Sequence, residues 1–131
     1  MSEAPITAWS TVISVLGLLA LSLPISRRRF MVRVRLGHGR DQTLHALVRA
    51  QANFVEYVPL ALITFGLAET AGAPSLAVLV CAVMLGVGRI LHALGMYRDA
   101  SPPLRASGML LTWSAMGAAA ITLAGRLAKL W

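Results

Sequence analysis

Four apolar stretches, each long enough to cross a lipid bilayer as a helix, divide this chain of 131 residues. A bilayer core needs about 20 mostly apolar residues per helix. The stretches cover roughly residues 6–24, 44–71, 74–96 and 104–127. We therefore expect an all-α integral membrane protein, with one domain over residues 1–131 that is built as a bundle of four transmembrane helices.

The composition excludes several other classes of protein. Hydrophobic residues make up 57% of the chain and charged residues 13%, whereas a soluble domain usually has about 25% charged residues. A soluble enzyme and a disordered tail are therefore poor interpretations. Cys81 is the single cysteine, so a disulfide scaffold is excluded as well. We expect the first stretch to be retained as an anchor, because no Lys or Arg precedes it as in a signal peptide.

The net charge of +7 is concentrated in one segment. Six of the twelve basic residues lie between Arg27 and Arg40, in a predicted loop over residues 25–43. Basic residues between two apolar stretches are typical of cytoplasmic loops, and the rest of the chain offers no basic face for nucleic acid. We expect this loop to face the cytoplasm, with both termini on the outer side of the membrane.

Prolines punctuate the predicted helices. Pro24 stops the first apolar stretch, just before the arginines. Pro59 is expected to kink the second helix near Val55, because proline removes one helical hydrogen bond. Pro102 and Pro103 mark the turn before the last stretch.

A polar stripe interrupts the second stretch. Arg49, Asn53 and Glu56 are spaced by four and three residues, so they share one face of a helix, and His45 extends that face. A charge at a helix centre in the membrane costs about 2.5–3.5 kcal/mol. The stripe therefore predicts either an Arg–Glu latch that fastens helices together or a binding site for a small zwitterionic ligand, whose carboxylate an arginine would hold.

A second group of polar residues lies near the end of the third stretch. Arg89, His92 and Met96 share a face by the same spacing, and Arg105 opens the fourth helix. Arg89 either snorkels to the interface or belongs to a site, and His92 either makes an interhelical hydrogen bond or binds a ligand. A cation at a helix N-terminus is unfavourable, which favours a partner for Arg105 over a surface role. The histidines lack metal-ligand spacing, so we expect no metal.

Residues 49–59, RAQANFVEYVP, resemble the second-helix signature of the MAPEG superfamily, membrane-associated proteins in eicosanoid and glutathione metabolism. The spacing is similar to that of the leukotriene C synthases, and the pattern Arg89, His92, Gly95 and Arg105 resembles the bacterial branch. This chain departs from the eukaryotic members at His92 and Met96, where they have tyrosines. The resemblance implies a homotrimer in a bacterial inner membrane, with glutathione as cosubstrate between subunits and a lipophilic small molecule that enters from the bilayer.

The resemblance also assigns residues to roles. Arg105 matches the arginine that stabilises the glutathione thiolate. The residues it assigns to glutathione binding are Arg49, Gln51, Asn53, Glu56, Tyr57, Arg89 and His92. One arginine among Arg27, Arg28 and Arg29 joins them, and counting along the chain selects Arg28. The function implied is that of a membrane-bound glutathione S-transferase or peroxidase. A non-catalytic ligand-binding or adaptor protein of the same fold is the alternative, and a transporter is less supported because the outer half of the second helix is apolar.

Overall fold

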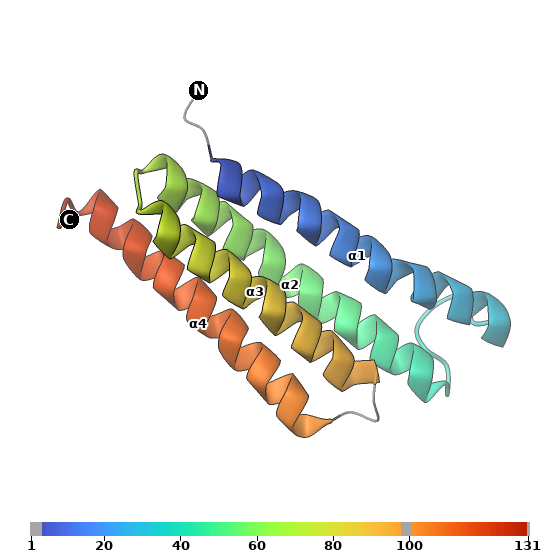
Figure 1. Ribbon diagram of the computed structural model, residues 1–131. Coiled ribbons are helices and arrows are strands. Elements are labelled where there is room, and N and C mark those ends of the chain that lie inside the picture. Colours follow the sequence, from blue (N-terminus) through green and yellow to red (C-terminus); the bar gives the residue numbers. More distant parts are fainter. Residues whose placement is uncertain (1–3, 98–100, 131) are drawn as a thin grey trace.

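The computed structural model describes residues 4–97 and 101–130 and forms a bundle of four helices (Figure 1). The helices alternate in direction, so both chain ends lie at the same end of the bundle. We call the opposite end, where the α1–α2 loop lies, the loop end. The helix bounds are α1 (Pro5–Val32), α2 (Gln42–Thr70), α3 (Ser75–Tyr97) and α4 (Pro102–Leu127). The predicted all-α four-helix architecture is confirmed.

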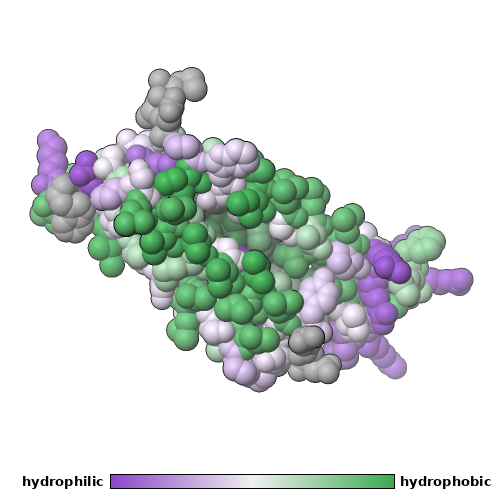
Figure 2. All heavy atoms as spheres, in the orientation of Figure 1, coloured by the Kyte–Doolittle hydropathy of each residue, from purple (hydrophilic) through white to green (hydrophobic). Residues whose placement is uncertain are grey.

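The surface of the bundle suits a membrane. By length and composition, α1, α3 and α4 can each cross a bilayer. Helix α2 has a lower mean hydropathy than these three helices, because it carries the polar stripe. Its 29 residues nevertheless run beside α1 and α3 (Figure 1). Apolar side chains cover much of the face in Figure 2, and hydrophilic ones gather toward the two ends.

The first helix is longer than predicted. It passes through Pro24 and ends only at Val32. The next residue, Arg33, adopts a left-handed conformation (φ 55°), and its backbone N–H donates a hydrogen bond to the backbone carbonyl of Arg29. Proline lacks one N–H donor but does not prevent the following residues from being helical. The predicted loop over residues 25–43 is therefore wrong at both ends, and the arginines at 27–29 lie on a helix. Helix α2 likewise continues through Pro59.

Small residues let α3 and α4 approach closely, as is common in membrane bundles. A Cβ atom added at Gly108 would lie 2.6 Å from the backbone oxygen of Gly88 and 2.6 Å from the backbone nitrogen of His92. By contrast, a Cβ at Gly86 or Gly117 would meet no atom within 4 Å. The packing therefore requires glycine at residues 88 and 108, whereas it leaves room for a larger residue at 86 and 117.

The end of the bundle that carries the termini is packed and capped. Its core is built on Phe65, which is fully buried, with Ala61, Ala68 and Ala119 around it. Glu69 ties the start of α1 to the end of α2. One of its carboxylate oxygens accepts a hydrogen bond from the Ile6 N–H (3.0 Å), and the other accepts from the N–H (2.9 Å) and hydroxyl (2.8 Å) of Thr7. These bonds satisfy helix N-terminal donors that would otherwise lack partners.

Candidate functional site

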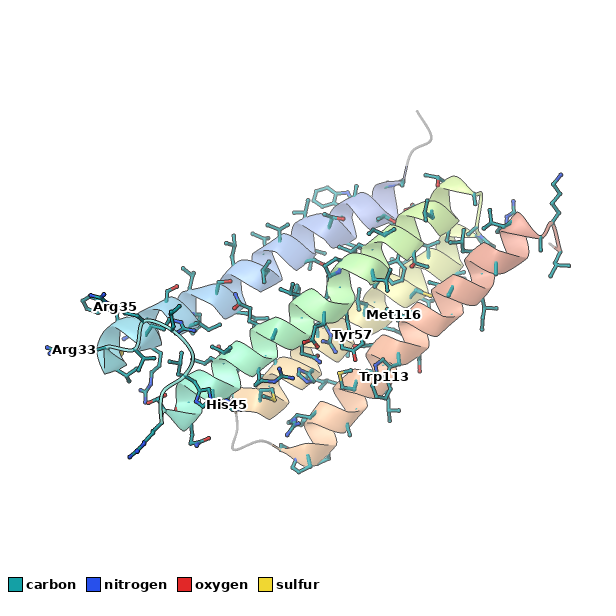
Figure 3. All side chains as sticks on the ribbon, turned by 180° about the vertical axis from the view of Figure 1, so that it is seen from behind. Arg33, Arg35, His45, Tyr57, Trp113 and Met116 are labelled. Carbon is teal, nitrogen blue, oxygen red and sulfur yellow. The ribbon has the colours of Figure 1, made fainter. Side chains whose placement is uncertain are left out.

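A buried guanidinium joins three helices near the middle of the bundle. Arg89 of α3 is only 7% exposed. Its Nη1 donates to Asn53 Oδ1 on α2 (2.6 Å), and its Nη2 and Nε donate to Thr112 Oγ1 on α4 (2.7 and 3.1 Å). The ring of Tyr57, labelled in Figure 3, lies on the same side, with its centroid 5.8 Å from Arg89 Cζ. We call Arg89, Asn53, Thr112 and Tyr57 the arginine cluster.

The arginine cluster decides between two interpretations of the sequence. Arg89 does not snorkel, because its guanidinium donates to groups inside the bundle. Among the described residues no carboxylate pairs with it. Burying a charge is costly unless hydrogen bonds satisfy it, and here an amide and a hydroxyl do so. Of the two alternatives for the polar stripe, the Arg–Glu latch is not formed among the described residues, and the helices are fastened by hydrogen bonds from Arg89 to Asn53 and Thr112. Asn53 is thereby committed to this contact.

A cavity of about 420 Å³ opens at the loop end between α2, α3 and α4. It is lined by Gln42, Thr43, His45, Ala46, Leu47, Arg49, Met96, Tyr97 and Arg105. Arg49 and Arg105 come from different helices, and both are exposed. Arg105 reaches the cavity because its backbone packs against Gly95, where a Cβ would lie 2.8 Å from the Arg105 backbone nitrogen. The fold thus gathers two of the predicted arginines, with His45, around one hollow.

Neither cavity arginine is neutralised by another residue of the described part of the chain. Within residues 4–97 and 101–130, the structure gives no ion pair or side-chain hydrogen bond to Arg49, Arg105 or Glu56. Glu56 is exposed on α2, two helical turns from Arg49 and on the same face, which is about 10 Å along the axis. This surface therefore offers two free cations and a free carboxylate, and it can hold a ligand that carries both signs of charge.

His92 lies deeper, on the same face of α3 as Arg89. It is 7% exposed, and its backbone packs directly against Gly108 of α4. This position places it between the arginine cluster and the loop end, away from the lipid-facing surface.

Two predicted site residues lie elsewhere. Arg28 is paired with Asp41 (Nη2 to Oδ2, 2.7 Å), and Gln51 donates to Ser22 Oγ on α1 (2.6 Å). Gln51 is two residues after Arg49 and therefore about 200° further round the helix. The chain does not bring Arg28 or Gln51 to the cavity.

Asp41 has a role that the sequence analysis did not assign. It caps α2 by accepting a bond from the Leu44 N–H (2.6 Å) while it holds Arg28. The hydrogen bonds from Arg28 and from Leu44 lower the pKa of its carboxyl below the ordinary value. Its position just before the helix is the usual signal for a cap and would have identified it. Thr112 was missed too, because nothing in the sequence separates it from the other hydroxyl residues of the same stretch, Ser107, Ser114 and Thr122.

Comparison with known proteins gives consistent matches. The sequence profile of the MAPEG family matches residues 6–125, which include every site residue described above. The inner membrane protein YecN of Escherichia coli strain K12 is 33% identical over 111 residues, which are 85% of this chain and 84% of that protein. The protein of the same name from Escherichia coli O6:H1 strain CFT073 matches to the same extent.

Proposed function

The chain belongs to the MAPEG family, and from this premise we propose that it is a membrane-bound glutathione S-transferase or peroxidase. The family covers membrane proteins of glutathione and eicosanoid metabolism. The cavity at the loop end supports the more specific role, activation of the glutathione thiol.

One observation carries the proposal: Arg49 and Arg105 meet at one cavity, and neither is neutralised within the described chain. Arginine binds carboxylates through two parallel hydrogen bonds. Glutathione has two carboxylates, an ammonium and a thiol. Arg49 would hold a carboxylate and Glu56 the ammonium, and Arg105 remains for the thiol. Tyr57, Arg89 and Asn53 belong to the arginine cluster, which ties together the helices that form the cavity.

The task of Arg105 is to favour the thiolate. A cysteine thiol ionises with a pKa near about 8.5, and a neighbouring guanidinium favours the charged form. Lowering that pKa by about two units requires about 2.7 kcal/mol of differential stabilisation. Glutathione would supply the nucleophile. The bilayer would supply the electrophile or lipid hydroperoxide, because the bundle exposes apolar side chains to lipid.

Two faces of α2 support a homotrimer. Arg49 and Glu56 lie on one face, and Gln51 lies on the other, against Ser22 of α1, the helix that also carries Arg28. A pocket that used all of them would draw its two halves from two copies of the chain. A neighbouring copy would also give Glu56 partners in place of lipid, where a free charge is costly.

The proposed location is the inner membrane, with the loop end in the cytoplasm and both termini in the periplasm. The cluster of arginines at the loop end favours this orientation. The printed name of the E. coli relatives, inner membrane protein, supports the membrane.

A glutathione titration of the detergent-purified protein, read by the ultraviolet absorbance of the thiolate near neutral pH, tests the proposal. We expect a saturable thiolate signal from the wild type. Arg105→Leu should reduce this signal, and in a conjugation assay it should lower the rate by about 100-fold, as for the loss of one charge-stabilising donor. Arg40→Leu, which removes an exposed arginine outside the cavity, should leave the signal unchanged. Unchanged conjugation in an Arg105→Leu protein that still binds glutathione would overturn the role of Arg105.

A groove favours the alternative function, a non-catalytic ligand-binding or adaptor protein. It lies between α1 and α3, has a volume of about 550 Å³, and is lined largely by apolar residues that include Trp9, Phe54 and Leu79. Such a groove suits a lipophilic molecule and requires no chemistry. Saturable binding of a lipophilic probe without any glutathione binding would favour this alternative over the enzyme.

A further inference from the structure

The end of α1 and the loop after it form a basic surface that the proposed glutathione site does not use. Residues 27–41 contain six arginines and one carboxylate, Asp41. Arg28 already pairs with that carboxylate. Five arginines of this segment therefore have no acidic partner among the described residues. They are Arg27, Arg29, Arg33, Arg35 and Arg40.

Part of this surface is shaped into a groove. The left-handed turn at Arg33 reverses the chain, and Arg29 Nη1 donates to the carbonyl of Arg35 (3.4 Å), which holds the loop against the helix end. The groove has a volume of about 860 Å³ and is lined by Arg29, Phe30, Met31, Arg33, Val34 and Arg35. Arg33 and Arg35 project from the end of the bundle, away from the cavity that His45 lines (Figure 3).

The groove also carries large apolar side chains in the open. Phe30 is 87% exposed and Met31 is 61% exposed, beside three arginines. Topology alone explains the arginines, because basic loops set orientation, but it does not explain an exposed phenylalanine between them. Apolar and basic side chains on one surface are the combination that binds at the headgroup level of a membrane.

We propose that this groove binds an anionic phospholipid of the adjacent leaflet. The phosphate would lie between Arg33 and Arg35, whose guanidinium groups match phosphate oxygens in pairs. The first carbons of the acyl chains would lie against Phe30 and Met31. Nucleic acid fits less well, since no apolar side chain is needed to hold a phosphate backbone.

Native mass spectrometry of the full-length protein tests the site, with phosphatidylglycerol and phosphatidylcholine of identical acyl chains as the probes. We expect the wild type to retain phosphatidylglycerol preferentially. Arg35→Gln should reduce that preference about fivefold, since each arginine near an anionic surface contributes about that factor. Arg40→Gln removes the same charge from the same loop but outside the groove, and it should reduce the preference less than Arg35→Gln does.

A second matched pair tests the apolar part of the site. Phe30 lines the groove, whereas Leu36 is equally exposed, at 88%, but does not. Phe30→Ala should lower retention of phosphatidylglycerol, and Leu36→Ala should not. Equal retention of both lipids by the wild type, or equal losses from Arg35→Gln and Arg40→Gln, would overturn the proposal. The glutathione titration of these variants should be unchanged. The lipid site and the proposed enzymatic function can therefore be tested independently of each other.

Discussion

Helix α2 carries a glutamate near its middle and another in its last turn, and the two are used in opposite ways. Glu69 is half-buried and accepts three hydrogen bonds from the start of α1. Glu56 is exposed and has no hydrogen bond or ion pair among the described residues. Both are carboxylates on one helix, so the difference comes from what the neighbouring helices present to each of them.

The same contrast separates the two halves of the bundle. Toward the chain ends Glu69 has three hydrogen-bond donors and the core is packed around the fully buried Phe65. Toward the loop end two arginines face a cavity, and neither has a counter-charge among the residues that the structure describes. We infer that the half of the bundle near the chain ends mainly stabilises the fold and that the half near the loop end is available for a ligand. Three predictions test this division, and a fourth tests the Arg28–Asp41 pair at the loop end.

The largest expected effect is on stability, at Phe65. Phe65→Ala leaves a cavity in a fully buried site, and such changes cost about 3–5 kcal/mol. Leu67→Ala, two residues along and exposed, should change the free energy of unfolding by less than about 0.5 kcal/mol. Both can be measured by SDS titration followed by circular dichroism. A loss of glutathione affinity at Phe65→Ala without loss of stability would contradict the division.

The two glutamates provide the sharpest pair of variants. Glu69→Gln removes a charged acceptor from three hydrogen bonds and should lower the free energy of unfolding by about 1–3 kcal/mol, with glutathione affinity unchanged. Glu56→Gln should leave stability unchanged and weaken glutathione binding by about tenfold, which corresponds to about 1.4 kcal/mol. The same SDS titration and a glutathione binding isotherm measure both quantities. Equal changes in stability and in glutathione affinity for the two variants would contradict the proposed difference between the two halves of the bundle.

The glycines of α3 and α4 test the packing that positions Arg105. Gly108→Ala would bring a Cβ within 2.6 Å of two backbone atoms of α3. Overpacking of this kind costs about 1–3 kcal/mol, and it should also weaken glutathione binding by moving the start of α4. Gly117→Ala, on the same helix with open space around it, is the control and should be neutral. Thermal unfolding in detergent and the glutathione titration give the two readouts.

The smallest effect is expected from pH, at Asp41. Since the folded protein lowers the pKa of this carboxyl through Arg28 and Leu44, its contribution to stability is present above the ordinary aspartate pKa. That contribution is lost as the pH falls through the lowered value. Asp41→Asn should therefore flatten the decline of the melting temperature below about pH 5. A wild-type and a variant curve of identical slope would show that the pair has no role in acid stability.

The sequence predicted the four-helix architecture correctly because few architectures can span a membrane. Backbone polar groups must be satisfied within each segment in lipid, so long apolar stretches become helices. The helical spacing also predicted the shared face of Arg49, Asn53 and Glu56. Local signals were weaker at helix ends, where Pro24 was read as a stop although α1 continues to Val32.

What the sequence determined by itself was therefore the set of helices, the membrane, and the family to which the RAQANFVEYVP segment points. Only the tertiary structure decided the partners. It gave Arg89 to Asn53 and Thr112, Arg28 to Asp41, and Gln51 to Ser22. It brought Arg49 and Arg105 to one cavity, where neither has an acidic partner among the described residues. The physical reason is that helical periodicity fixes which residues share a face, whereas a hydrogen bond between helices depends on their rotation and depth, which close packing at residues such as Gly88 and Gly108 sets.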